Sequence, residues 1–296
     1  MMFHVKHGIK LKYPLVLVHG AGFRDKIFGI NYWGRIPRYL AQEGVTVHYG
    51  GTDAWGSIES NGELLKQTIL AVLAKTGAEK VNILAHSRGG LEARYVINAL
   101  GLENAVASLT TMSTPHRGAR VMNIALKFPL WLYRFASVFV DLWSALMGDK
   151  NPDFFRSSRQ LAESYCSVFN RDYPNKDGIY YQSYTSVLRF FFSDLMYLFT
   201  WILVRIFDGP NDGLCPQESA KWGDFRGTVT SRWLFGVSHD SILDSRRFPF
   251  RGIRVIPPPN RSNGSDESGL PVEQRAPLKV PELYVSIVRE LAEKGF

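Results

Sequence analysis

The chain has 296 residues, of which 45% are hydrophobic and 13% aromatic, enough apolar material for a sizeable core and too much for an intrinsically disordered protein. Its formal net charge is +8, but the basic residues are scattered and no recognised nucleic-acid motif gathers them, so we expect no nucleic-acid partner. The two cysteines, Cys166 and Cys215, are too few for a disulfide framework, and the sequence leaves their pairing open.

The amino-terminal residues, MMFHVKHGIKLKYPL, contain neither the apolar stretch nor the cleavage pattern of a secretory leader. We therefore expect no signal peptide within this sequence. The compartment stays open, because a complete chain would be cytoplasmic and a chain with a trimmed leader would be secreted.

Strands and helices alternate in the predicted amino-terminal half. The β-branched apolar run LVLV at 15–18 is typical of a parallel strand buried on both faces. The pattern continues with a helix around 64–74, a strand at 81–84, a helix from about Gly89 and a strand at 108–112. This alternation predicts βαβ units, and hence an α/β fold with a doubly wound, mostly parallel sheet.

Two later segments, 131–147 and 188–207, are more apolar than ordinary surface helices. Both contain charges, so neither reaches the run of about 18 uncharged apolar residues that a membrane span needs. The polar residues of the first are spaced three, four and three apart, in one narrow stripe: Arg134, Ser137, Asp141 and Ser144. We predict one domain, 1–296, with helical lid insertions at about 120–170 and 186–207.

The remaining sequence predicts a loop and a helix. Residues 257–281 are rich in Pro, Ser, Asn and Gly, which is typical of a flexible surface loop. A final amphipathic helix is expected at about 282–294.

The sequence AHSRGG at 85–90 predicts a sharp turn between a strand and a helix. A serine on such a turn is strained and projects from the sheet edge, while small flanking residues let strand and helix come close. The pattern is G-x-S-x-G with Ala85 in the first position, a small steric change. We predict that Ser87 is the nucleophile of a serine hydrolase rather than a helix-capping serine. His86 is expected to point away from the substrate.

A second glycine-rich turn, His19-Gly20-Ala21-Gly22, follows the first predicted strand. In folds with such an elbow, the loop after that strand and the residue after the nucleophile each supply one backbone N–H to an oxyanion. The predicted donors are the amides of Ala21 and Arg88.

A serine nucleophile needs a histidine base and an acid that orients it, in the chain order Ser, acid, His. Of the seven histidines, only His239 lies in the carboxyl-terminal half, after an apolar stretch at 233–237 that we interpret as the last strand. Asp212 is the predicted acid, because its Asn-Asp-Gly loop is tight enough to aim a carboxylate inward. The rival acids are Asp208, Asp224 and Asp240.

These segments together resemble the bacterial true lipases, the family I triacylglycerol lipases of the α/β-hydrolase superfamily. The matching stretches, in the family's order, are YPLVLVHGAG, INYWGRIPRYL, VNILAHSRGGLEARYV, LTTMSTPHRG, DGIYYQSY, NDGL and VSHDSILD. They span about 13–244, and the elbow with Ala85 is similar to the branch found in Gram-positive bacteria. The resemblance implies an α/β-hydrolase fold, a triad of Ser87, Asp212 and His239, and an oxyanion hole from the amides of Ala21 and Arg88.

The resemblance also bears on metals and cysteines. Many relatives bind calcium through an Asp two residues after the catalytic His, and this sequence has Ser241 there, which leaves Asp240 or Asp244 as substitutes. The His/Asp cluster of the zinc-binding thermophilic branch is not recognisable, and Cys215 comes too early for the family's bridge to be transferred. We expect no cofactor and no metal.

The predicted activity is that of a carboxylic-ester hydrolase, most specifically a triacylglycerol lipase acting through an acyl-enzyme at a lipid–water interface. One alternative is an esterase of short soluble esters or aliphatic polyesters with the same triad, and another is a membrane- or partner-binding protein with a relic triad. Segment 131–147 follows STPHRG, where related lipases place their lid, and its expected lid and substrate contacts are Trp131, Phe135 and Phe139. In water this segment should close over Ser87 and bury its apolar face.

Overall fold

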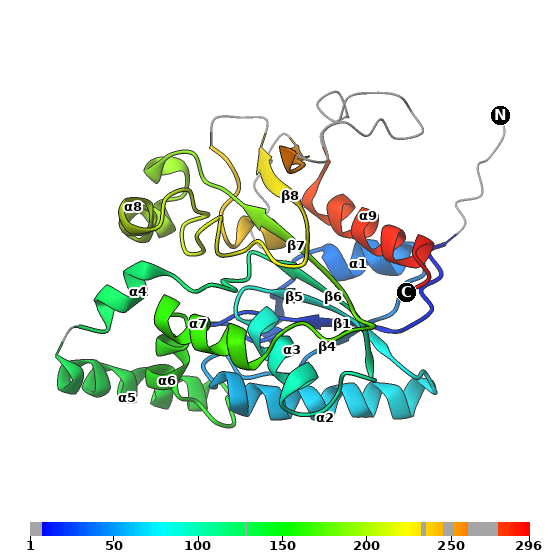
Figure 1. Cartoon of the computed structure of the whole chain (residues 1–296), viewed down its shortest axis with the longest axis horizontal. Helices are drawn as coiled ribbons and strands as arrows, with labels where there is room; N and C mark the ends of the chain where they lie inside the picture. Colours follow the sequence, from blue (N-terminus) through cyan, green and yellow to red (C-terminus); the bar gives the residue numbers. More distant parts are fainter. Residues whose placement is uncertain (1–7, 128, 232–234, 245–251, 260–277) are drawn as a thin grey trace.

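The structure is a computed structural model that describes residues 8–127, 129–231, 235–244, 252–259 and 278–296. Within these residues, seven strands form one sheet in the order β4-β1-β5-β6-β7-β8-β9 (Figure 1). Their bounds are β1 Leu15–Val18, β4 Val47–Tyr49, β5 Val81–His86, β6 Val106–Met112, β7 Tyr180–Ser186, β8 Asp224–Ser231 and β9 Ile253–Ile256. Every pair is parallel except β8 with β9, so the predicted α/β fold with a mostly parallel sheet is confirmed. A small separate hairpin joins β2 (Lys26–Ile27) to β3 (Ile30–Asn31).

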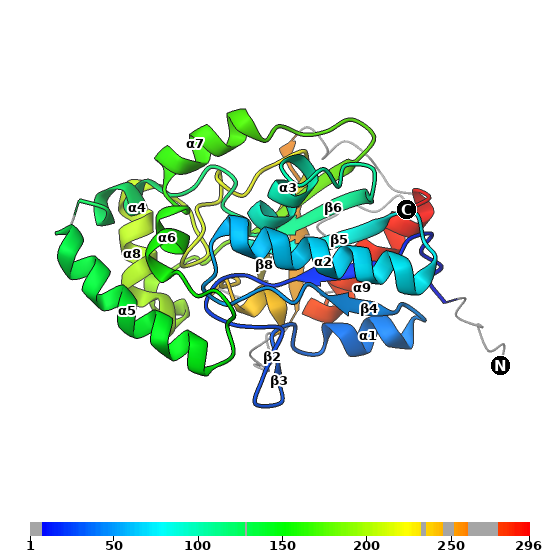
Figure 2. The same ribbon diagram turned by 90° about the horizontal axis from the view of Figure 1, so that it is seen from below.

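Helices cover both faces of the sheet, which is why its central strands are apolar on both sides (Figures 1 and 2). On one face lie α1 (Ile36–Gln42) and α9 (Val280–Glu293), and on the other α2 (Ile58–Thr76) and α3 (Gly89–Asn98). Alternate residues of β1 divide between the two cores. Leu15 and Leu17 pack with α1 and α9, whereas Val16 and Val18 pack with α2 and α3.

The remaining helices lie in the chain that follows the carboxyl ends of β6 and β7. Between β6 and β7 come α4 (Arg120–Ala125), α5 (Leu130–Leu146), α6 (Phe154–Arg159) and α7 (Glu163–Asp172). After β7 comes α8 (Leu198–Phe207). In both views, α4, α5 and α8 gather at one end of the molecule (Figures 1 and 2). No helix in the described ranges is long and apolar enough to cross a membrane.

Two predicted elements differ from the structure. The helix expected at 188–207 begins only at Leu198, after the short 3-10 turns η1 (Phe191–Ser193) and η2 (Leu195–Tyr197). The chain is extended at Asp194, whose side chain accepts a hydrogen bond from the Met196 amide and so starts a new turn.

The strand expected at 233–237 is also wrong for residues 235–237, the part of it that the structure describes. Residues 232–234 lie outside the described ranges, and the following residues form a turn with a single bridge from Gly236 to Leu188. Gly236 has a φ of +80°, which no regular strand accommodates. The strand is β8, which ends earlier, at Ser231. Most of the loop predicted at 257–281 lies outside the described residues, and the final helix starts two residues earlier than predicted.

Candidate active site

Ser87 lies on the turn between β5 and α3 with a φ of +54°, a left-handed conformation that costs energy for any residue with a side chain. The two glycines after it make this turn sterically feasible. A Cβ on Gly89 would lie 2.4 Å from the carbonyl oxygen of His19, and one on Gly90 would lie 2.3 Å from Thr114 Oγ1. Because α3 can start this close to its neighbours, Ser87 is held at the carboxyl edge of the sheet, only partly buried.

Ser87, His239 and Asp212 form a continuous hydrogen-bonded chain. His239 Nε2 lies 2.8 Å from Ser87 Oγ, and His239 Nδ1 lies 2.9 Å from Asp212 Oδ2. His239 and Asp212 are both buried. The fold therefore brings together the three residues that the sequence singled out, from the ends of three different segments.

Two of the rival carboxylates, those of Asp208 and Asp224, have other partners. Asp208 accepts hydrogen bonds from the amides of Arg120 and Val121 at the start of α4. Asp224 accepts from Tyr180 Oη and pairs with a guanidinium, that of Arg226.

The Asp212 carboxylate is fully surrounded by hydrogen-bond donors. Its Oδ1 accepts from the amides of Leu214 and Cys215, and its Oδ2 accepts from Ser186 Oγ as well as His239. Burial by itself would raise the pKa of Asp212, but His239 and these donors outweigh it and lower the pKa below its ordinary value. Burial likewise pulls the pKa of His239 down, and Asp212 raises it above the ordinary 6.5.

We expect any Ser87-dependent hydrolysis to be lost as the pH falls through this raised pKa of His239. Only the neutral imidazole can accept the serine proton, so the acid limb of kcat/KM should lie above pH 6.5, the ordinary histidine value. A profile of kcat/KM from about pH 5 to pH 9 measures the limb. Samples held at each pH and assayed after return to neutral pH would separate titration from unfolding. An acid limb below 6.5 would contradict a raised pKa of His239.

The two predicted oxyanion donors flank the nucleophile. A Cβ on Gly20 would lie 2.6 Å from Ser87 Cβ, which shows how closely the loop before Ala21 approaches the serine. Arg88, the residue after Ser87, caps the start of α3. In the described part of the chain, neither the Ala21 amide nor the Arg88 amide donates to a protein acceptor. Both are thus free to donate to a negative charge that develops beside Ser87.

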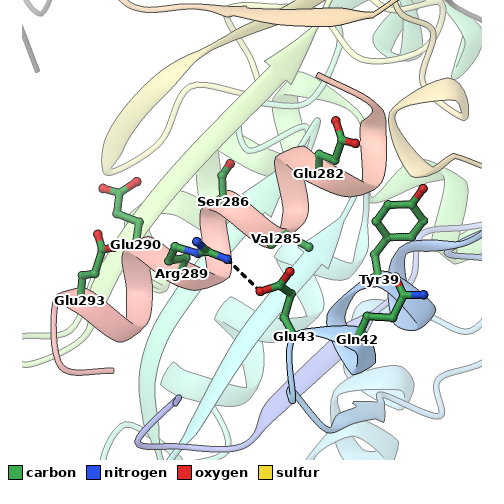
Figure 3. Close-up of a pocket in the computed structure, with 9 residues that line it drawn as sticks. All are labelled: Tyr39, Gln42, Glu43, Glu282, Val285, Ser286, Arg289, Glu290 and Glu293. Carbon is green, nitrogen blue, oxygen red and sulfur yellow. Dashed lines mark hydrogen bonds and ion pairs between the residues drawn. The ribbon is translucent and has the colours of Figure 1, made fainter. Parts of the chain in front are cut away.

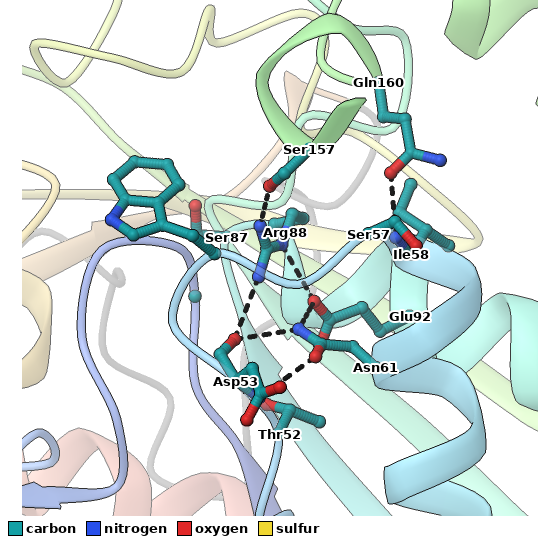
Figure 4. A network of polar contacts seen from close by, with 12 residues as sticks. Thr52, Asp53, Ser57, Ile58, Asn61, Ser87, Arg88, Glu92, Ser157 and Gln160 are labelled. Carbon is teal, nitrogen blue, oxygen red and sulfur yellow. Dashed lines mark hydrogen bonds and ion pairs between the residues drawn. The ribbon is translucent and has the colours of Figure 1, made fainter. Parts of the chain in front are cut away.

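The side chain of Arg88 has a structural role that sequence reasoning missed. Its guanidinium is completely buried and donates to Glu92, to the carbonyl oxygens of Asp53 and Ala54, and to Ser157 of α6 (Figure 4). The N–H groups of a buried guanidinium need hydrogen-bond acceptors, and each of these contacts supplies one. Arg88, the residue whose amide is a predicted oxyanion donor, therefore also ties the elbow to the loop after β4 and to α6. The only signal in the sequence was the spacing of an Arg and a Glu four residues apart on one helix.

His86 is fully buried, and its ring packs against that of His239 with centroids 4.5 Å apart. Tyr32 Oη accepts from the Gly20 amide and lies within hydrogen-bond distance, 2.7 Å, of His86 Nδ1. Burial, followed by the neighbouring His239, lowers the pKa of His86 well below its ordinary value. A second imidazole, whose pKa is lowered, thus supports the ring of His239. Tyr32 and His86 are distant in sequence, so no local pattern indicated this contact.

The expected closure of 131–147 over Ser87 is wrong. Trp131, Phe135 and Phe139 are 72%, 62% and 60% exposed, whereas Ser137 and Ser144 of the polar stripe are buried. Three members of the stripe face the protein, where the Asp141 carboxylate, for example, accepts from the Phe154 amide, whereas the fourth, Arg134, is exposed. The apolar side of α5 consequently faces outward and leaves Ser87 uncovered by these side chains.

Two further observations concern metals and cysteines. In the described ranges, no group of three or more His, Cys, Asp or Glu side chains is arranged to hold a metal ion. Asp244, a substitute considered for the calcium ligand, is held by Arg35, whose Nε and Nη2 lie 2.6 and 2.7 Å from its two oxygens. Cys166 and Cys215 are free, buried thiols.

A separate hollow lies between α1 and α9, and none of the triad residues lines it (Figure 3). Its walls are mostly polar, and Arg289 bridges them by donating to Glu43 at 2.9 Å. It is therefore not part of the Ser87 site.

Comparison with known proteins gives consistent matches. A family model described as alpha/beta hydrolase fold matches residues 13–222. A triacylglycerol lipase of Pseudarthrobacter phenanthrenivorans is 33% identical over 176 residues, which are 55% of this chain and 54% of that protein. Triacylglycerol lipase 2 of Saccharomyces cerevisiae is 31% identical over 216 residues, 68% of this chain and 60% of that protein. The chain thus spans between half and two thirds of the length of these curated relatives.

Solved structures share the fold at lower identity. The lipase of Staphylococcus hyicus superimposes with a TM-score of 0.63 at 16% identity, over 99% of this chain and 98% of that one. A metagenomic carboxyl esterase superimposes with a TM-score of 0.68 at 15% identity, over 97% of this chain and 78% of that one. At such identities the likeness concerns the fold alone.

Proposed function

Since the chain belongs to the alpha/beta hydrolase fold family, we propose that it is a serine-dependent carboxylic-ester hydrolase, and more specifically a triacylglycerol lipase. The observation that carries this proposal is the unbroken chain of hydrogen bonds from Ser87 through His239 to Asp212. The backbone amides of Ala21 and Arg88, which have no protein acceptor among the described residues, flank Ser87. These are the parts that acyl transfer requires.

The proposed reaction has two halves. His239 Nε2 takes the proton of Ser87 as its Oγ attacks the ester carbonyl carbon, and the resulting oxyanion accepts from the amides of Ala21 and Arg88. The protonated His239 then gives its proton to the leaving alkoxide, which leaves the acyl group on Ser87. Water, deprotonated by His239, attacks this acyl-enzyme and releases the acid. Asp212 remains ionised throughout and holds the Nδ1–H of the base.

Two observations support lipids as substrates. Curated relatives over 30% identical are named triacylglycerol lipases. The helices α5 and α8, which follow strands that end at the Ser87 edge of the sheet, carry many exposed apolar side chains. We further propose that the insertions at about 120–170 and 186–207 belong to one domain with the sheet, and that the reaction needs no metal or other cofactor.

A second candidate is an esterase of short soluble esters or aliphatic polyesters. It is favoured by the partial exposure of Ser87 and by the outward direction of the α5 side chains that were expected to cover it. This candidate uses the same triad and differs only in the acyl group and in the physical state of the substrate.

Hydrolysis rates across a series of ester chain lengths test the proposal. For a lipase we expect emulsified long-chain triacylglycerols to be cleaved at least as fast as dissolved short-chain esters, with the same rates in the presence of a chelator. Cleavage of dissolved short esters alone would leave the serine mechanism in place and replace the substrate class. No hydrolysis of any ester would refute the enzyme itself. A loss on chelation that calcium restores would refute the metal-free reaction.

A further inference from the structure

The Ala54 carbonyl, in the loop after β4, joins the two segments that carry the predicted oxyanion donors. It accepts from the amide of Gly22 at 2.9 Å, and Gly22 directly follows Ala21. It also accepts from the guanidinium of Arg88, whose Nη2 lies 3.2 Å away. One acceptor therefore holds both the loop of the first donor and the side chain of the residue that carries the second.

The loop that carries Ala21 packs directly against the loop that contains Ala54. Gly22 has a φ of +85°, a conformation in which its amide can reach the Ala54 carbonyl. A Cβ on Gly22 would lie 3.4 Å from Cζ2 of Trp55, the residue after Ala54. The two loops are thus in contact through backbone and side chain, so the position of the Ala21 amide depends on that of Ala54.

Glu92 and Asn61 fix the direction of the Arg88 guanidinium. Glu92 Oε1 accepts from Arg88 Nε and from Asn61 Nδ2, both at 2.8 Å. Asn61 Nδ2 also donates to the Asp53 carbonyl at 2.8 Å, and Arg88 Nη2 donates to the same carbonyl at 3.2 Å. These four bonds form a closed ring (Figure 4). The guanidinium therefore cannot turn away from the loop after β4 without breaking the ring.

Stability by itself is a poor explanation for a charged pair at this place. Arg88 and Glu92 are both completely buried. The attraction within a buried ion pair roughly offsets the loss of its water, and replacing such a pair with apolar residues is often neutral or stabilising. What the pair does supply is direction, because its hydrogen bonds fix the backbone beside Ser87 from one side.

We propose that the Arg88 guanidinium, held by Glu92, positions the oxyanion hole by keeping the Ala21 and Arg88 amides at the spacing that a tetrahedral oxyanion requires. Both side chains are positioning groups, since they act through backbone amides. The inference rests on the proposed function, because the oxyanion forms only when Ser87 attacks an ester. Oxyanion donors act on the transition state more than on the bound substrate, so their displacement should lower kcat and leave KM nearly unchanged.

The double variant Arg88→Met/Glu92→Leu removes the ion pair without leaving a buried charge unpaired. Each carbonyl that loses the guanidinium keeps a second donor, the Asn61 side chain or the Gly22 amide, so the protein should remain folded. Arg88→Lys is the second variant. It keeps a positive charge beside Glu92, but one ammonium cannot reproduce the fork of Nε, Nη1 and Nη2 donors.

We expect the double variant to lower kcat on a dissolved short-chain ester about 10²-fold, with KM changed less than about threefold. Arg88→Lys should lower kcat about tenfold or more. An alkylboronic acid forms a tetrahedral adduct on Ser87 with an oxygen toward the oxyanion donors, so its affinity should fall by the same factors as kcat. The acid limb of kcat/KM should not move, because both variants leave His239 and Asp212 in place.

The matched control is Arg94→Met. Arg94 is also completely buried on α3, but its guanidinium donates to Asn170 and to the Tyr173 carbonyl, in and after α7, instead of to the loop after β4. This variant should lower the free energy of unfolding, measured with urea, while kcat and boronic acid affinity stay within about twofold of the wild type. Circular dichroism shows which variants are folded.

The outcomes separate the inference from the proposed function. A wild type that hydrolyses esters, together with a folded double variant or Arg88→Lys that keeps wild-type kcat and boronic acid affinity, would overturn positioning alone. An equal loss of kcat in Arg94→Met would assign the effect to stability, and a shifted acid limb would assign it to His239, so either would also overturn positioning. A wild type that hydrolyses no ester would refute the proposed function and the inference with it.

Discussion

Replacing Ser87 with alanine should lower kcat for ester hydrolysis by about 10⁶-fold while the protein remains folded. The substitution removes the oxygen that lies 2.8 Å from His239 Nε2, so no acyl-enzyme can form. The backbone strain at a φ of +54° is common to serine and alanine, so the free energy of unfolding should change little. The measurements are kcat on a dissolved ester and covalent labelling by a fluorophosphonate.

A control is Ser108→Ala in β6, because Ser108 is a buried serine whose hydroxyl donates to Asn82, away from the triad. It should retain both turnover and labelling. Labelling of another serine in the wild type, or turnover by Ser87→Ala near the wild-type rate, would show that Ser87 is not the nucleophile.

Sequence reasoning worked best where one local pattern determines the structure. The run at 15–18 is β1 to the residue, because apolar side chains on both faces suit only a strand covered on both sides. The elbow was equally well defined, since Gly89 and Gly90 are needed for the close start of α3. The Asn-Asp-Gly loop also encodes its own geometry, because Asp212 bonds to amides only two and three residues ahead.

Contacts between distant segments were not predictable in the same way. The side chain of Arg88 reaches Ser157, and Tyr32 reaches His86, across 69 and 54 residues of sequence. Neither pair shares a periodic pattern or a motif. Only the folded chain shows that Arg88, the residue after Ser87, also anchors the elbow.

The orientation of α5 could not be predicted from the sequence for a different reason. Periodicity correctly placed Ser137, Asp141 and Ser144 on one side of a helix, but it does not say which side faces the protein. The usual assumption that the apolar side turns inward gave a closed lid. Bonds formed outside the helix, such as that from the Phe154 amide to Asp141, decide the opposite orientation.

Asp212→Asn should lower kcat by about 10⁴-fold with little change in substrate binding, although the substituted group is nearly identical in shape. The surroundings of the carboxylate determine how the amide must lie. Asp212 Oδ1 faces two N–H donors, those of Leu214 and Cys215, so the asparagine oxygen must take this position. Its NH₂ group then replaces Oδ2, where Ser186 Oγ can accept one of its hydrogens and His239 Nδ1 must accept the other.

This orientation of the asparagine amide holds His239 in the tautomer that cannot act as a base toward Ser87. With Nδ1 as an acceptor, the neutral ring of His239 carries its proton on Nε2 and donates to Ser87 Oγ, so it cannot take the serine proton. Loss of the carboxylate should also lower the pKa of His239, which moves any remaining acid limb to lower pH. Asp208→Asn and Asp224→Asn are the matched controls, because each is a rival carboxylate with partners away from the base. Parallel measurements of kcat and of the pH profile decide the assignment: if either control variant lost activity while Asp212→Asn kept it, the acid of the site would be that other aspartate.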